Sequence, residues 1–141
     1  MVKHERLRRG EEMGRKIVGN KWDRLVEVLQ ETHPDMAKYI VEWAYGEVFA
    51  RPDLGLRERE IASVVSLTIL RLGPQLKTHI YGALNVGITE RELMELFVHI
   101  AMFVGFPTAL FGTRIAKDVF EELARKKKAS RPDDGKEIKL P

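Results

Sequence analysis

The sequence predicts an all-α protein, a single compact domain of six to seven helices. Apolar residues recur at the 3.6-residue period of amphipathic helices, and no segment shows the strict alternation of a β-strand. Glycine and proline interrupt these runs at short intervals, as they do where helices end and begin. The length of 141 residues suffices for one hydrophobic core and not for two.

The first half of the chain predicts three helical segments. Residues 1–20 form a charged helical arm whose three glycines weaken it, so we expect it to form only by docking on the rest of the protein. Residues 22–29 carry the apolar spacing of an amphipathic helix. Pro34 suits the first position of the next helix, which we expect to continue to about Phe49. A loop over 51–55 ends it.

The second half predicts four further segments. The helix over 56–72 is apolar on most of its circumference, so we expect it to be central and buried on most sides. The helix over 75–86 ends at Gly87, a left-handed stop. Thr89-Glu90-Arg91-Glu92 is a capping box that begins the next helix. The last helix runs from about 108 to 127. The expected organisation is therefore an arm (1–20), a helical domain (21–127) and a basic, disordered tail (128–141).

Composition and charge exclude several classes of protein. There is no cysteine, so disulfides, thiolate zinc sites and dithiol redox chemistry are excluded. No apolar run reaches the roughly 18 residues of a membrane span, and no apolar signal core follows the charged N-terminus, so we expect a cytoplasmic protein without a membrane partner. Residues 125–141 hold seven Lys/Arg and three Asp/Glu. The basicity therefore lies in the tail, which can touch phosphate only non-specifically.

Two histidines lie within apolar helical patterns. His79 either has a structural role, bonded to a carbonyl or to water, or acts as a general acid or base, because imidazole titrates near neutrality. For His99 a structural role in the core or at an interface is the stronger interpretation. The two residues have no spacing typical of metal ligands, so we predict no metal site.

Two glutamates lie in helices that are otherwise largely apolar. Glu47 would be desolvated in its aromatic surroundings unless it is paired, and Arg51, four residues on, is the expected partner. Glu60 follows two arginines near the start of its helix, where an acid also suits the helix dipole. Each therefore has a structural interpretation beside a catalytic one.

Four segments together resemble the carboxymuconolactone decarboxylase family. They are 43–52 (WAYGEVFARP), 56–61 (LREREI), 79–89 (HIYGALNVGIT) and 99–107 (HIAMFVGFP). The resemblance covers roughly residues 20–124. It implies an AhpD-like all-α fold assembled as a homo-oligomer, a trimer or a hexamer, with sites near subunit interfaces.

The wider superfamily includes alkylhydroperoxidases with a Cys-x-x-Cys motif. Counting from His79 places those cysteines at Leu72 and Gln75, and the associated glutamate at Glu60. The histidine and glutamate are kept and the thiols are absent, so the chain is not a peroxidase.

The resemblance implies a carbon-carbon lyase of aromatic catabolism that decarboxylates a lactone such as γ-carboxymuconolactone, or a relative acting on a similar small molecule. No cofactor is expected, because the lactone is itself the electron sink. His79 would polarise the carbonyl or donate a proton, and Glu47 would be a second acid. Arg51 would hold a substrate carboxylate. The candidate catalytic residues are His79, Glu47 and Glu60, and the candidate substrate-binding residues are Arg51, Trp43 and His99.

Two alternatives to a decarboxylase stay open. One is a weak nucleic-acid-binding protein, since 87–93 resembles the turn of a helix-turn-helix; the following helix is too apolar to face a groove, so we expect no specific nucleic-acid partner. The other is a catalytically silent helical oligomer. In that case Glu47→Gln and His79→Ala would change stability only.

Overall fold

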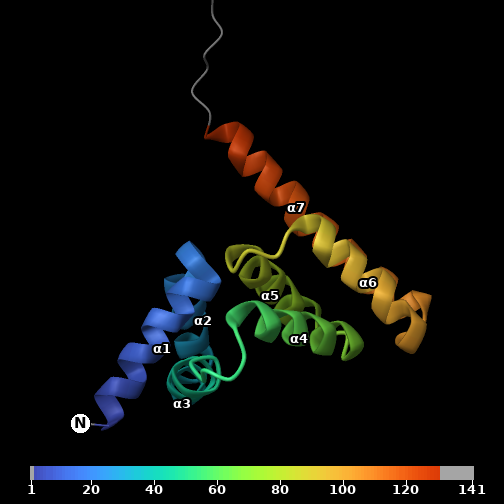
Figure 1. Cartoon of the computed structure of the whole chain (residues 1–141). Coiled ribbons are helices and arrows are strands. Elements are labelled where there is room, and N and C mark those ends of the chain that lie inside the picture. Colours follow the sequence, from blue (N-terminus) through green and yellow to red (C-terminus); the bar gives the residue numbers. More distant parts are fainter. Residues whose placement is uncertain (1, 131–141) are drawn as a thin grey trace, which may run out of the picture.

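The computed structural model describes residues 2–130, and all regular structure within them is helical (Figure 1). The all-α prediction is confirmed. The predicted tail lies outside the described residues from position 131 onward, and the last helix continues two residues beyond its predicted end. The elements are α1 (Val2–Val18), the 3-10 helix η1 (Gly19–Lys21), α2 (Trp22–Thr32), α3 (Pro34–Tyr39), the π-helix η2 (Ile40–Val48), α4 (Leu56–Ile69), α5 (Gly73–Asn85), α6 (Glu90–Val104) and α7 (Phe106–Ala129).

The local signals for helix starts and stops are confirmed. Pro34 occupies the first turn of α3. Gly87 has a φ of 94°, in the left-handed region that glycine tolerates. The Thr89 hydroxyl accepts the Glu92 N–H at 3.1 Å, and the Glu92 carboxylate accepts the Thr89 N–H at 2.8 Å, which completes the capping box. These features depend on neighbouring residues only, so the sequence predicts them well.

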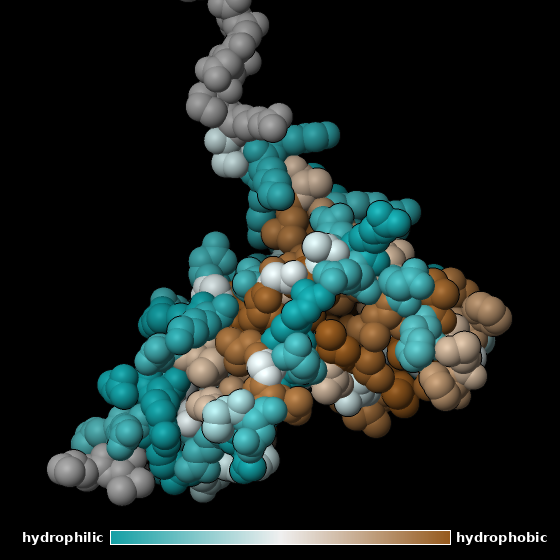
Figure 2. Space-filling model, in the orientation of Figure 1, coloured by the Kyte–Doolittle hydropathy of each residue, from teal (hydrophilic) through white to brown (hydrophobic). Residues whose placement is uncertain are grey.

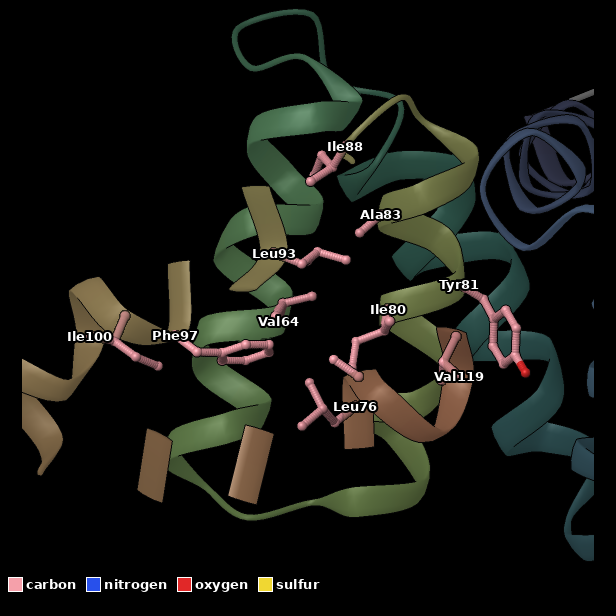
Figure 3. Close-up of a cluster of buried hydrophobic side chains, with 11 residues drawn as sticks. Val64, Leu76, Ile80, Tyr81, Ala83, Ile88, Leu93, Phe97, Ile100 and Val119 are labelled. Carbon is pink, nitrogen blue, oxygen red and sulfur yellow. The ribbon is translucent and has the colours of Figure 1, made fainter. Parts of the chain in front are cut away.

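Two hydrophobic clusters hold the helices together. The larger lies between α4, α5, α6 and α7, where Val64, Ile80, Leu93 and Phe97 point toward one another (Figure 3). The smaller joins α1, α2 and η2, and its largest member is the fully buried Trp22. Helix α5 contacts both α1 and α7, so it connects the two halves.

The N-terminal arm docks on η2 through glycine, as its weak helix propensity led us to expect. A Cβ atom on Gly10 would collide with the carbonyl oxygen of Val41, and a Cβ atom on Gly46 would collide with the carbonyl oxygen of Arg6. The two backbones therefore approach more closely than larger side chains would permit. The glycines that weaken α1 in isolation are the residues that let it pack.

Two helix predictions are wrong in detail. The expected regular helix to Phe49 is a short α-helix, α3, followed by the π-helix η2, whose wider turns the apolar pattern does not encode. The expected central helix, α4, buries only Glu60, Val64 and Thr68, one position every four residues. Within one chain its remaining positions are half-buried or exposed, because its main packing partners are α5, α6 and α7.

Hydrophobic side chains gather on one side of the molecule, over α4 and α6, whereas the α1 to α3 side is largely hydrophilic (Figure 2). Five large apolar side chains at the ends of α4 and α6 and the start of α7 are more than 60% exposed. They are Leu70, Val98, Met102, Phe103 and Phe106. We call them the apolar face. Among the helices described, none has the length and apolar character needed to cross a membrane.

Candidate active site

The candidate site is built on a histidine and a glutamate from adjacent helices. His79 lies in the second turn of α5 and Glu60 lies in the second turn of α4. The His79 Nδ1 atom is 3.0 Å from the Glu60 Oε2 atom. The Glu60 side chain is fully buried, whereas the His79 side chain remains 20% exposed. The structure thus brings together two of the three predicted catalytic residues.

The space for the Glu60 carboxylate is provided by a glycine. A Cβ atom on Gly82 would lie 3.1 Å from Glu60 Oε2 and 2.9 Å from Ile17 Cγ2, so any larger residue would crowd the carboxylate. Within residues 2–130, Oε1 of Glu60 has no hydrogen-bond partner. A buried carboxylate with one unpartnered oxygen is costly, and proteins retain such groups where they have a role beyond stability.

Aromatic rings fix the orientation of the His79 ring. Phe49 stacks on His79 with a centroid separation of 6.3 Å and an interplanar angle of 16°. Tyr45 stacks in turn on Phe49 at 5.3 Å, and Trp22 meets Tyr45 edge-on at 4.8 Å. Burial, together with the negative charge of Glu60, raises the pKa of the Tyr45 hydroxyl, so this residue stays neutral beside the carboxylate.

The exposed edge of His79 opens into a shallow hollow of about 370 Å³ between α4 and α5. Ser63 and Ser66 belong to the helix over 56–72, which the sequence predicted to be buried on most sides, and Phe49 was not among the predicted site residues. The helical spacing of Ala62, Ser63 and Ser66 puts them on one side of α4, but only the placement of α5 shows that this side adjoins His79. The residues lining the hollow are Phe49, Ala62, Ser63, Ser66, Leu67 and His79.

The predicted ion pair between Glu47 and Arg51 is wrong. The Glu47 Oε1 atom lies 2.6 Å from Arg6 Nε, so its partner comes from the docked arm α1. Arg51 is instead 3.8 Å from Asp53. The π-helical turns of η2 and its close contact with α1 account for this difference, because they direct Glu47 toward α1. Glu47 is not among the residues that line the hollow at His79.

The other predicted substrate-binding residues lie elsewhere on the surface. Trp43 is 58% exposed on η2 and does not line the hollow at His79. His99 is exposed and lines a separate hollow between α4 and α6, together with Arg57 and Glu92. Its ring is tilted against Phe103 of the apolar face, at a centroid distance of 5.7 Å. Within one chain, therefore, the structure does not bring these residues to His79.

The Glu60–His79 pair has the geometry of a proton donor and acceptor held by a carboxylate. A carboxylate that accepts Nδ1–H selects one tautomer and leaves the second ring nitrogen to give or take a proton at the hollow. In the part of the chain that the structure describes, no group of three or more acidic or histidine side chains is arranged to hold a metal ion.

Known proteins resemble this chain over most of its length. The sequence profile of the carboxymuconolactone decarboxylase family matches residues 34–118. The 4-carboxymuconolactone decarboxylase of Acinetobacter baylyi is 30% identical over 124 residues, which cover 87% of this chain and 92% of that protein. Nitrosuccinic acid decarboxylase npaB of Metarhizium robertsii is 28% identical over 95 residues, 67% of this chain and 66% of that protein. This chain therefore belongs to the carboxymuconolactone decarboxylase family.

Proposed function

We propose that this chain is a decarboxylase that acts without a cofactor on a small carboxylated substrate, with a lactone such as γ-carboxymuconolactone as the first candidate. The observation that carries the proposal is the His79 ring at the edge of a hollow, held by a fully buried carboxylate 3.0 Å away. Two relatives support the reaction class, since each is named as a decarboxylase although their substrates differ.

The proposed reaction needs an electron sink and a proton. The bond between the carboxylate carbon and the ring carbon breaks, and carbon dioxide leaves. The electron pair passes through the conjugated double bond to the lactone carbonyl oxygen, forming a dienolate. A proton is then added to the carbon that the carboxylate left or to its vinylogous position, and the carbonyl re-forms. The protein must therefore stabilise a developing oxyanion and supply one proton.

His79 is the proposed source of that proton. The ring faces the hollow with one edge and Glu60 with the other, so a proton lost from the ring to the substrate leaves a neutral imidazole that Glu60 still orients. As an imidazolium, the same ring can donate a hydrogen bond to the developing oxyanion. Phe49, stacked on the ring, limits its rotation. Glu60 is thus the residue that positions the proton donor.

The remaining predicted site residues stay proposals. Arg51 is the proposed cation for a substrate carboxylate, and its side chain is 66% exposed, with a long contact to Asp53 as its one ion pair among the described residues. Trp43 and His99 are the proposed walls, and Glu47, which pairs with Arg6, is proposed as a second acid with only a small share in turnover. Because these residues lie apart within one chain, the proposal places them at a site completed by another copy of the protein.

The apolar face supports such an assembly. Met102, Phe103 and Phe106 are each more than 70% exposed, and adjoining exposed apolar groups of this size mark protein–protein contacts. We assign a second copy of this chain as the partner, in a trimer or a hexamer, because α4 has a sequence apolar on most sides yet buries only one side within the monomer. No specific nucleic acid is proposed.

The turnover of γ-carboxymuconolactone, followed by ultraviolet absorbance, tests the reaction. We expect wild-type activity, and a loss of at least about a hundredfold in kcat for His79→Ala with folding unchanged by circular dichroism. Unchanged turnover in a folded His79→Ala variant would remove His79 from the mechanism. Inactivity of the wild type toward this lactone would remove the named substrate. The silent-oligomer alternative is supported if panels of related carboxylated lactones and nitro acids are also inert.

Light scattering coupled to size-exclusion chromatography tests the assembly. Phe103→Glu places a charge on the most exposed residue of the apolar face, and we expect it to dissociate the oligomer to monomers. Val28→Glu, at a partly exposed position of α2, is the matched control and should leave the assembly intact. A wild-type protein that elutes as a monomer would contradict the assembly without bearing on the chemistry of His79.

A further inference from the structure

We propose that a pocket between α1, α2 and the α3–η2 segment binds a small organic cation, an alkylammonium group. The pocket has a volume of about 180 Å³ and lies where α1, α2 and α3 gather (Figure 1). Its polar lining includes two carboxylates, Glu11 and Glu42, and the amide of Gln30. The pocket shares no lining residue with the hollow at His79, so the inference goes beyond the proposed function and does not rest on it.

Glu42 is a buried carboxylate that lines this pocket without a partner from the described chain. Among residues 2–130, the buried polar side chains outside the aromatic residues are Glu42, Glu60 and Thr68. Glu60 is paired with His79, and the Thr68 hydroxyl donates to the Val64 carbonyl oxygen at 2.7 Å. Glu42 is 8% exposed, yet it makes no ion pair and no side-chain hydrogen bond within residues 2–130. A carboxylate taken out of water without a replacement partner is costly, so its position at a pocket indicates a cation that binds there.

Glu11 places a second carboxylate at the pocket. Its Oε2 atom accepts a hydrogen bond from the indole N–H of the buried Trp22 at 2.8 Å, which fixes the position of the side chain. Among the described residues, its one ion pair is a 3.5 Å contact with Arg15. An ammonium group has three N–H donors, so one such group can bond both carboxylates and still donate to the side-chain oxygen of Gln30.

Lys38 does not neutralise the pocket. It is the one basic residue in the lining, and it precedes Glu42 by four positions, a spacing that pairs side chains on a regular α-helix. The chain changes from α3 to the π-helix η2 at Ile40, between the two residues, and the wider turn alters that register. Lys38 is exposed and makes no ion pair within residues 2–130. Two carboxylates and one ammonium group leave the pocket with a net negative charge.

The rest of the lining favours an organic cation over a metal ion. Leu7, Val26 and Val41 give the pocket apolar walls, which suit an alkyl chain. A divalent metal ion needs more ligands than two carboxylates supply, and no group of three or more acidic or histidine side chains in the described part of the chain is arranged to hold one. The volume is below the roughly 300 Å³ at which pockets for drug-sized ligands begin, so the ligand is a small amine.

Titration of the intact protein with n-butylammonium chloride, followed by NMR, tests the inference. The indole N–H of Trp22 is the reporter, because a cation at Glu11 changes the surroundings of the proton that Glu11 accepts. The chain has two tryptophans, so Trp43→Phe assigns the two indole signals. We expect a saturable shift of the Trp22 signal. Potassium chloride, the control for ionic strength, and 1-butanol, the control for the alkyl chain, should not produce it.

Glu42→Gln and Glu31→Gln make the test specific, since each removes one negative charge from the protein. Glu31 is exposed on α2 and does not line the pocket. We expect Glu42→Gln to weaken the binding of n-butylammonium by at least about tenfold, because a charge-assisted hydrogen bond is replaced by a neutral one. Glu31→Gln should change the affinity by less than about twofold. A shift that fails to saturate, or equal weakening by the two variants, would overturn the inference.

Glu42→Gln also separates ligand binding from a structural role. A buried carboxylate without a partner destabilises the empty protein, so in the absence of amine the variant should have a urea denaturation midpoint at least as high as that of the wild type. A lower midpoint would show that Glu42 is paired within the protein. An oligomer that dissociates in Glu42→Gln, measured by light scattering, would assign the pocket to a basic side chain of a second copy. Either result would contradict a free amine as the ligand.

Discussion

Glu60 and Glu47 are both carboxylates within helices that the sequence shows as largely apolar, and the structure gives them opposite surroundings. Glu60 is fully buried between α4 and α5, with the His79 ring as its hydrogen-bond partner. Glu47 is 39% exposed on η2 and pairs with the guanidinium of Arg6. The pairing partner of each carboxylate comes from a different helix, so the helical periodicity of the sequence does not distinguish them.

The difference shows what separates a reactive carboxylate from a structural one. An exposed ion pair contributes about 1 kcal/mol or less, because water screens both charges. A buried carboxylate has lost its hydration, so it stays ionised only where neighbouring groups replace the lost hydrogen bonds or carry the opposite charge. Its partner is therefore held in a defined position. We therefore expect substitution of Glu60 to lower the rate of the reaction and substitution of Glu47 to lower the stability of the fold slightly.

The largest effect is expected from Glu60→Gln. The amide keeps the shape of the side chain and removes the negative charge that orients the His79 ring through Nδ1, so kcat should fall by about a hundredfold. We expect KM to change by no more than about twofold, because Glu60 is buried beneath the ring and does not face the substrate. Steady-state kinetics with the preferred substrate measure both. A change confined to KM would contradict the positioning role.

Gly82→Ala tests whether the space for the carboxylate matters. Helix propensity alone predicts that alanine stabilises α5 by about 1 kcal/mol. The structure predicts the opposite sign, since the added methyl group would crowd Glu60 and Ile17; we expect a loss of about 1–3 kcal/mol. Urea denaturation followed by circular dichroism measures the free energy of unfolding. Stabilisation by the alanine would show that the packing around Glu60 has room to relax.

Glu47→Gln is the direct counterpart of Glu60→Gln. Because Arg6 already engages Glu47 and the contact is partly exposed, we expect a loss of stability of at most about 1 kcal/mol. Turnover should fall far less than in Glu60→Gln, by no more than about threefold. Parallel kinetics and denaturation of the two variants give the comparison. A loss of kcat equal to that of Glu60→Gln would support Glu47 as the second acid at a site shared between copies.

The smallest effect concerns Glu92, an exposed carboxylate held by local contacts. The Thr89 N–H, then Arg57, then the Thr89 hydroxyl lower the pKa of Glu92 to about 2, from an ordinary value of 4.5. Since the folded pKa is the lower one, its stabilising contribution is complete above about pH 4.5 and is lost as the pH falls toward about 2. Glu92→Gln should therefore be less stable than wild type near neutrality.

The pH dependence of that difference is the measurement. Denaturation midpoints of the wild type and Glu92→Gln should converge as the pH is lowered, because the wild-type carboxylate becomes protonated. Glu90→Gln, in the same first turn of α6, is the matched control for the effect of the helix dipole alone. A gap that stays constant with pH would show that the ionised form of Glu92 is not what stabilises the cap.

The sequence predicted most helices and the signals between them, because these depend on residues within a few positions of each other. The capping box at Thr89 and Glu92, the stop at Gly87 and the start at Pro34 are local in this sense. The family resemblance also followed from short motifs with fixed spacing. The π-helical turns of η2 did not, since an apolar segment has the same composition whether its turns are α-helical or π-helical.

By itself, then, the sequence determined the helical class, the family and the identity of His79 and Glu60 as candidates. Tertiary structure alone decided that these two side chains meet and that Glu47 pairs with Arg6. The physical reason is that burial and pairing depend on which helices pack together. Gly10 and Gly82 permit the close packing of helices at these positions, but the atoms that each glycine faces belong to distant parts of the chain.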